Sequence, residues 1–203
     1  MKTKIISVIN QKGGVGKTTT VINLAAGLAN LDKKILVIDL DPQGNATTGL
    51  GHSNIDGSEK NIYNALNGSE SISDVIQTTQ FNNLDIITSN VDLSGLEVET
   101  AGDNGRAFIL RDKLSLFLKE KSPNYTHVFI DCPPSLSLLT VMALVASNSL
   151  IVPLQTEFFA LEGLSKLIKT IELVKTNLNI NLKLNGIVLT MYDKRNSLSS
   201  LIE

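Results

Sequence analysis

The sequence NQKGGVGKTTT, residues 10–20, differs by one residue from the phosphate-binding pattern G-x-x-x-x-G-K-[ST]. Gln11 stands where the first glycine is expected, and Lys12 adds a second lysine to the loop. The preceding residues, Lys4–Asn10, form an aliphatic run typical of a buried strand, and Lys17–Leu31 have apolar residues at helical spacing. A glycine-rich loop between a strand and a helix is the context in which this pattern indicates phosphate binding.

The glycines of this loop allow it to hold an anion. A residue without a Cβ atom lets backbone N–H groups turn inward and approach a phosphate closely. The following helix directs its N-terminal dipole and free N–H groups at the same point. Lys17 can reach the terminal phosphates, and the Thr18 hydroxyl can ligate Mg²⁺. The residues expected to bind the nucleotide are Gly13, Gly14, Val15, Gly16, Lys17, Thr18 and Thr19.

Short aliphatic runs alternate with helical patterns along the chain, which predicts an α/β fold. The runs are continuous rather than alternating, so we expect a doubly wound, mostly parallel sheet with helices on both faces. Residues 1–203 are expected to form one domain. The predicted strands are Lys4–Asn10, Lys34–Asp41, Leu84–Ser89, His127–Ser135, Ser149–Leu154 and Leu182–Met191.

Three amphipathic helices are predicted between these strands. In Lys17–Leu31 the buried face is expected to contain Val21, Leu24, Ala25 and Leu28. In Glu162–Lys175 it is expected to contain Leu164, Leu167, Ile168, Ile171 and Val174. The third helix is Arg106–Lys121, which ends before a proline. Residues 51–73, rich in Asn, Ser and Gly, are interpreted as a surface excursion with a short helix around Tyr63–Leu66.

Three aspartates follow predicted strands. Asp39 and Asp41 lie in VIDLDPQGN, and Asp131 lies in VFIDCPPS. The carboxyl ends of parallel strands meet at one edge of a sheet, where ligands bind. A carboxylate there can hold Mg²⁺ through water or orient an attacking water, although a single aspartate after a strand is more often a helix cap or turn residue. The role of Asp39 is left open.

The composition is that of an ordinary globular protein, with 42% hydrophobic and 19% charged residues and a net charge of −2. Eleven acidic residues and one basic residue fall between Asp39 and Gly105, so the remainder of the chain is basic. Cys132 is the only cysteine, which excludes a disulfide framework and a multi-cysteine metal site. The apolar run near the N-terminus is too short for a signal peptide and no later run reaches membrane-spanning length, so we expect a cytoplasmic protein.

Five blocks in this order resemble the ParA/Soj family of chromosome- and plasmid-partitioning ATPases, a branch of the MinD/ParA superfamily with a deviant Walker A loop. They are KGGVGKTTT, DLDPQGNATTGLG, FIDCPPSL, VPLQTEFFALEGLSKL and TMYDKRNSLS. The resemblance extends from Lys4 to Ser200. It implies a P-loop NTPase fold and an ATPase that binds ATP and Mg²⁺, in which ATP drives formation of a homodimer with two nucleotides sandwiched between the protomers.

The resemblance also implies roles for individual residues. Lys12 corresponds to the family's extra lysine, which reaches across the dimer to the partner's ATP. Asp41 corresponds to the aspartate needed for hydrolysis, and Asp131 to the Walker B aspartate that holds Mg²⁺ through water. Arg195 corresponds to an arginine implicated in binding non-specific DNA of the nucleoid. The implied partner is a ParB-type centromere-binding protein, which stimulates an otherwise slow hydrolysis.

Family members normally continue beyond the TMYDKRNSLS block, so we expect this chain to be short at its C-terminus. Two alternative functions remain open on that account. One is a MinD-like ATPase that positions itself on membranes through a C-terminal amphipathic helix. The other is a fragment without full activity. The sequence does not distinguish ATP from GTP, or chromosome from plasmid as the cargo.

Overall fold

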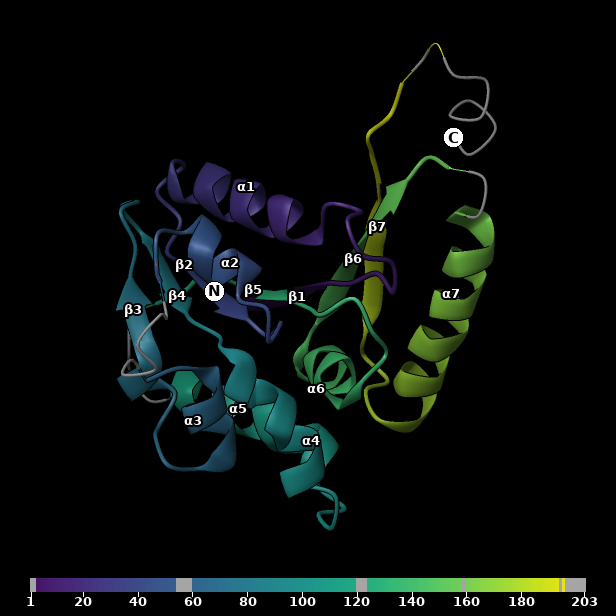
Figure 1. Ribbon diagram of the computed structural model, residues 1–203. Coiled ribbons are helices and arrows are strands. Elements are labelled where there is room, and N and C mark those ends of the chain that lie inside the picture. The colour runs from purple at the N-terminus through teal and green to yellow at the C-terminus, as the bar shows by residue number, and fades with distance from the viewer. Residues whose placement is uncertain (1–2, 54–59, 120–123, 158–159, 194, 196–203) are drawn as a thin grey trace.

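A seven-stranded sheet with the strand order β3-β4-β2-β5-β1-β6-β7 forms the centre of the molecule (Figure 1). Six of its strands are parallel, and only β3 at one edge pairs in the antiparallel sense, with β4. The computed structural model describes residues 3–53, 60–119, 124–157, 160–193 and 195. The doubly wound, mostly parallel sheet predicted from the sequence is confirmed.

The elements of the described chain follow one another in the alternation that the sequence predicts. The strands are β1 (Lys4–Val8), β2 (Ile35–Asp39), β3 (Ile76–Thr78), β4 (Leu84–Ile87), β5 (His127–Asp131), β6 (Ser149–Gln155) and β7 (Lys183–Thr190). The α-helices are α1 (Lys17–Ala29), α2 (Asn45–Gly49), α3 (Ile62–Asn67), α4 (Leu96–Glu99), α5 (Ile109–Lys119), α6 (Leu138–Ala146) and α7 (Ala160–Asn177). Short 3₁₀ turns are η1 (Ser73–Val75), η2 (Val91–Gly95) and η3 (Arg106–Phe108).

The side chains of each central strand point alternately to two separate cores, because successive residues of a strand face opposite sides of the sheet. In β2, Ile35 and Val37 belong to the core under α1, whereas Leu36 and Ile38 belong to the core under α5, α6 and α7. Helices therefore cover both faces (Figure 1). This explains why the strands are apolar without interruption.

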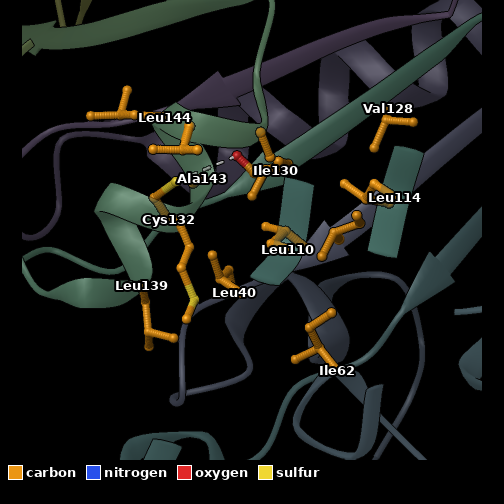
Figure 2. Packing of buried hydrophobic residues seen from close by; sticks show 14 of the residues in the cluster. Leu40, Ile62, Leu110, Leu114, Val128, Ile130, Cys132, Leu139, Ala143 and Leu144 are labelled. Atoms are coloured by element: carbon orange, nitrogen blue, oxygen red, sulfur yellow. Dashed lines mark hydrogen bonds between the residues drawn. The ribbon is translucent and has the colours of Figure 1, made fainter. Parts of the chain in front are cut away.

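Helix α6 is absent from the sequence prediction. Its nine residues, LLTVMALVA, are nearly all buried, so it lacks the polar face that marks an amphipathic helix. Figure 2 shows Leu139, Ala143 and Leu144 of this helix packed beside Ile130 and Cys132. The length of the apolar run, between two predicted strands, is the one signal that could have identified it.

The prediction that two particular residues lie on buried helix faces is wrong. Leu24 of α1 is 37% exposed, and Ile168 of α7 is 39% exposed. In α1 the buried positions are spaced by four residues, at Lys17, Val21, Ala25 and Ala29, which makes a narrower stripe than the prediction. Leu24 lies off this stripe because it is three residues from Val21.

The interpretation of residues 51–73 as a surface excursion needs correction as well. Helix α3 begins one residue earlier than the predicted helix, and its Ile62, Ala65 and Leu66 belong to the main core. Part of this segment, residues 54–59, lies outside the described residues. So does the end of the predicted helix Arg106–Lys121, whose described part is the 3₁₀ turn η3 followed by α5.

Candidate nucleotide-binding site

The glycine loop connects the carboxyl end of β1 to the first residue of α1, as predicted. Gly14 and Gly16 have φ angles of 73° and 87°, in the left-handed region that favours glycine. A Cβ atom added at Gly13 or Gly14 would meet no other atom within 4 Å. The backbone of the loop therefore faces open space on the side where those side chains would stand.

The N-terminus of α1 is available to an anion. Gly16 is its N-cap residue and so provides no side-chain cap, and the first turn holds no acidic residue. The free N–H groups and the positive end of the helix dipole favour a bound phosphate at this point. The Thr190 hydroxyl of β7 donates to the carbonyl of Val15 at 2.9 Å, which joins the loop to the far edge of the sheet.

Lys17 and Thr18 lie on the sheet side of the loop. The Lys17 side chain is buried, and its Nζ donates to the carbonyl of Lys12 at 3.0 Å. Burial lowers the pKa of Lys17, while the nearby carboxylates of Asp131 and Asp41 oppose that shift. The Thr18 hydroxyl donates to Oδ2 of Asp131 at 2.6 Å. The strand order thus brings the loop and the end of β5 together as predicted.

Asp131 is a buried carboxyl group with one oxygen left over. Burial raises its pKa to about 7, and the charges of Asp39 and Asp41 act in the same direction, whereas the Thr18 hydrogen bond and the Lys17 charge lower it. Its Oδ1 is buried and has no hydrogen-bond partner among the described residues. A buried acceptor without a donor requires an explanation, such as an ion or a water molecule.

These two side chains fit a hydrated magnesium ion. The Thr18 hydroxyl donates its hydrogen bond to Asp131, so its lone pairs remain available as an Mg²⁺ ligand. The unpaired Oδ1 of Asp131 can accept a hydrogen bond from a water bound to that ion. Mg²⁺ usually keeps several waters and takes few protein ligands, which agrees with so small a donor set.

Asp39 and Asp41 lie at the same edge of the sheet. The register pairs Asp39 of β2 with Asp131 of β5, and Asp41 is two residues further along the chain. Asp41 is 5% exposed, and its Oδ1 accepts a hydrogen bond from the backbone N–H of Gln43 at 3.0 Å. Burial raises the pKa of Asp39 to about 6, although three hydrogen bonds to its carboxylate lower it.

Lys12 forms an ion pair with Glu157, a contact that sequence reasoning did not anticipate. Glu157 lies just after β6, and both side chains are partly exposed. Asn10 holds the start of the loop: it accepts from the backbone N–H of Lys12 at 3.0 Å and donates to the carbonyl of Pro153 at 2.7 Å. In this structure Lys12 therefore pairs with a residue of its own chain.

Two further residues singled out in the sequence, Arg195 and Cys132, make contacts of other kinds. Arg195 is exposed and makes a two-point contact with Asp193, from Nε to Oδ1 at 3.0 Å and from Nη2 to Oδ2 at 2.7 Å. Cys132 is fully buried, and its thiol donates to the carbonyl of Ile130 at 3.8 Å (Figure 2). Burial raises the pKa of this thiol well above its ordinary value, which agrees with a packing role.

A cavity of about 1150 Å³ lies at the opposite ends of the strands from the glycine loop, near the amino ends of β1 and β5. The described residues that line it include Lys4, Lys33, Arg111 and Lys119, and no acidic residue. Helices α5 and α6 end at this edge, so these cations complement the negative ends of the helix dipoles. Among the described residues, no helix combines the length and hydropathy needed to cross a membrane.

Comparison with known proteins agrees with this geometry. A family model described as an AAA domain matches residues 3–184. The chromosome partitioning protein ParA of Caulobacter vibrioides is 48% identical over 199 residues, which are 98% of this chain and 73% of that protein. The sporulation initiation inhibitor protein Soj of Bacillus subtilis is 46% identical over 195 residues, which are 96% of this chain and 75% of that protein.

A solved structure with the same fold contains a nucleotide. Cobyrinic acid a,c-diamide synthase from Mycobacterium smegmatis, with bound ADP and magnesium, matches with a TM-score of 0.92 and 36% identity, over 99% of this chain and 80% of that one. The identity to ParA and to Soj is higher, and it extends over nearly the whole of this chain. The chain therefore belongs to the ParA/Soj family of chromosome- and plasmid-partitioning ATPases.

Proposed function

We propose that this chain is an ATPase that partitions DNA. The observation that carries the proposal is the open glycine loop at the N-terminus of α1, with Lys17 and the Thr18–Asp131 pair beside it. Relatives at 48% and 46% identity are a partitioning protein and a Soj protein. The related structure with ADP and magnesium supports ATP and Mg²⁺ as the ligands.

The proposed binding mode follows from the chemistry of the loop. The N–H groups of Gly13–Thr19 hold the phosphates, and Lys17 releases the carbonyl of Lys12 to contact the terminal phosphates. Thr18 and Asp131 hold Mg²⁺, the latter through water, and the ion supplies charge neutralisation at the phosphate oxygens. Asp41 orients the attacking water. The rate of such a reaction depends chiefly on positioning and on electrostatic stabilisation.

Lys12 couples ATP binding to dimerisation in the proposed ATPase. In a nucleotide-sandwich homodimer it contacts the phosphates of the ATP held by the partner subunit, so that ATP stabilises the dimer by mass action. To do so, Lys12 must leave Glu157. Hydrolysis then removes the ligand that joins the protomers. We expect intrinsic hydrolysis to be slow and to be stimulated by a ParB-type centromere-binding protein.

The proposed dimer binds DNA without sequence specificity. Arg195 is exposed and charged, and a dimer presents it twice, which increases avidity without any new contact. Contacts to phosphates carry no sequence information and weaken with salt. On this proposal residues 1–203 act as one ATPase domain that associates with the nucleoid in the cytoplasm.

The test is DNA binding by the full chain with ATP, with ADP and without nucleotide, measured by gel shift at constant Mg²⁺ and salt. We expect retention of DNA with ATP only. A parallel assay of phosphate release, with and without DNA, measures hydrolysis. Equal DNA binding in all three nucleotide states would contradict the proposed switch, and the absence of phosphate release would contradict the ATPase.

A further inference from the structure

Asp39 is a fully buried carboxylate whose two oxygens are both used within the chain. Its Oδ1 accepts from the backbone N–H of Asp41 at 3.1 Å. Its Oδ2 accepts from both the backbone N–H and the hydroxyl of Thr47, each at 2.8 Å. Since every one of these donors belongs to the segment that follows β2, Asp39 bonds to this segment and contacts no part of the glycine loop through these bonds.

These bonds tie down both ends of the segment that contains Asp41. One end is Asp41 itself, and the other is Thr47 in the first turn of α2. Helix α2 has Gly44 as its N-cap residue and hence no side-chain cap of its own. Asp39 accepts one of the N–H groups that the start of a helix leaves unpaired, and so replaces the missing cap.

The same hydrogen-bond network extends to the ends of β4 and β5. The Thr47 hydroxyl donates to Asp39 and accepts from the backbone N–H of Ser89 at 2.9 Å, just beyond β4. The backbone N–H of Leu40 donates to the carbonyl of Asp131 at 2.9 Å. The segment from residue 40 to residue 47 is therefore fixed to the ends of β2, β4 and β5 at once.

We propose that Asp39 is a positioning residue for hydrolysis: it holds Asp41 at the edge of the glycine loop without contacting the nucleotide. The inference rests on the proposed function, in which Asp41 orients the attacking water. Burial of a carboxylate is costly unless it is well hydrogen-bonded, and here every bond restrains the one segment that bears Asp41. A displacement of about 1 Å of a reacting group can lower a rate about 100-fold.

Asp39→Asn is the sharpest variant, because asparagine has the same shape but replaces one acceptor oxygen with an NH₂ group. That NH₂ faces a backbone N–H whichever way the amide is turned, so either the bond from the Asp41 N–H or the bond from the Thr47 N–H is lost. We expect kcat for ATP hydrolysis to fall by about 10-fold or more while KM for ATP changes by less than about 3-fold. Thr47→Ser keeps the hydroxyl and is expected to retain activity, whereas Thr47→Val is expected to lose it in part.

Asp85→Asn is the matched control for a purely structural effect. Asp85 is also buried, accepts from the Tyr125 hydroxyl at 2.6 Å and pairs with Lys34 at 2.6 Å, but lies near the amino end of β4. We expect Asp85→Asn to lower the free energy of unfolding without lowering kcat per folded molecule. A kcat that falls equally in both variants, or a KM that rises in place of a fall in kcat for Asp39→Asn, would overturn the positioning role.

Amide hydrogen exchange in the nucleotide-free protein separates this inference from the proposed function. We expect the N–H groups of Asp41 and Thr47 to be protected in the wild type and at least one of them to exchange faster in Asp39→Asn, with β1 and β5 unchanged. This readout requires no ATPase activity. If the wild type does not hydrolyse ATP, the proposed function fails, and unchanged protection at the two amides would independently contradict the restraint by Asp39.

Discussion

Lys12 and Lys17 are five residues apart in one loop, yet their surroundings differ sharply. Lys17 is 7% exposed and turns back onto the loop, where two carboxylates compensate part of its burial. Lys12 keeps a partly exposed side chain and pairs with Glu157. The first arrangement suits a residue that serves its own nucleotide, and the second suits one that can move to another protomer.

Removal of the Glu157 charge tests whether this ion pair restrains Lys12. A partly exposed pair contributes about 0–1 kcal/mol, and each dimer breaks two such pairs, so Glu157→Gln should lower the protein concentration needed for ATP-dependent dimerisation by up to about 25-fold. Light scattering across a concentration series measures this. Glu162→Gln is the matched control, because it removes the Glu162–Lys166 pair of α7. Weaker dimerisation of Glu157→Gln would instead mean that Glu157 supports the dimer.

Sequence patterns predicted the candidate site residues but not their contacts. The roles of Thr18 and Asp131 depend on a meeting between residues 113 positions apart, and the strand-end rule predicted this meeting. The Lys12–Glu157 pair and the bonds of Asp39 to Thr47 depend instead on the paths of loops. Hydrophobic periodicity carries no information about loop paths, so these contacts could not be predicted.

At the scale of elements, the glycine loop and α1 form one unit whose geometry depends on Gly16. An alanine there must adopt a left-handed φ of 87°, and its Cβ would lie 3.5 Å from Cγ2 of Thr190. Strain of this kind costs about 1–3 kcal/mol. We expect Gly16→Ala to lower both the free energy of unfolding, measured with urea, and the affinity for ATP, measured by calorimetry.

Gly27→Ala provides the opposite control within the same helix. Gly27 is exposed in the interior of α1, and a Cβ there would meet nothing within 4 Å. Replacing glycine with alanine inside a helix stabilises it by about 0.5–1 kcal/mol. We expect Gly27→Ala to raise the free energy of unfolding and to leave ATP affinity unchanged. A loss of stability similar to that of Gly16→Ala would contradict the explanation by backbone strain.

The amino end of β5 should make stability depend on pH. Burial, together with the charges of Lys4 and Lys33, lowers the pKa of His127 below its ordinary value of 6.5. The unfolded chain then binds a proton at His127 more readily than the folded protein does. The free energy of unfolding therefore decreases as pH falls from about 6.5 towards the lower pKa of the folded protein.

His127→Gln should therefore lose less stability than the wild type between pH 7.5 and pH 5.5, measured by urea unfolding at several pH values. Lys4→Gln removes one of the charges that lower the pKa and should give an intermediate result. The comparison of variants isolates His127 from Asp39 and Asp131, whose raised pKa values change stability in the opposite direction. Identical pH profiles for His127→Gln and the wild type would contradict the assignment.

The elements themselves were largely predictable, and the exceptions have a common cause. Six of the strands could be recognised because each is a continuous aliphatic run between polar loops, whereas the short edge strand β3, with the sequence IQT, was not predicted. Helix α6 was missed because it is buried on every side, and Leu24 and Ile168 were assigned to the core because their spacing permitted it. Which helix face meets the sheet depends on the width of the contact, and periodicity alone does not determine that width.

At the scale of the whole molecule, Arg195 and Asp193 form a pair whose balance should control DNA binding. Asp193 contacts both Nε and Nη2 of Arg195 and offsets its charge. We expect Arg195→Glu to abolish the ATP-dependent gel shift and Asp193→Asn to strengthen it, with a steeper dependence on salt. Light scattering with ATP should find both variants dimeric. Loss of the dimer in Arg195→Glu would indicate misfolding rather than a lost DNA contact.

The sequence predicts the sheet and its helices, but half of the chain's final block TMYDKRNSLS, residues 194 and 196–199, lies outside the described residues. The edge strand β7 is among the more exposed strands, with Leu184, Ile187 and Val188 each at least 39% exposed. Its parallel pairing with β6 was nevertheless predictable, because both runs are aliphatic and a helix separates them.

The role of Lys12 between protomers distinguishes this chain most clearly from an ordinary nucleotide hydrolase. Sedimentation velocity of Asp41→Ala, which should bind ATP without hydrolysing it, measures this role directly when compared with Lys12→Ala/Asp41→Ala. We expect the single variant to be dimeric with ATP and monomeric with ADP. The double variant should bind ATP and remain monomeric. A double variant that is fully dimeric with ATP would contradict the role of Lys12 in the partner's site.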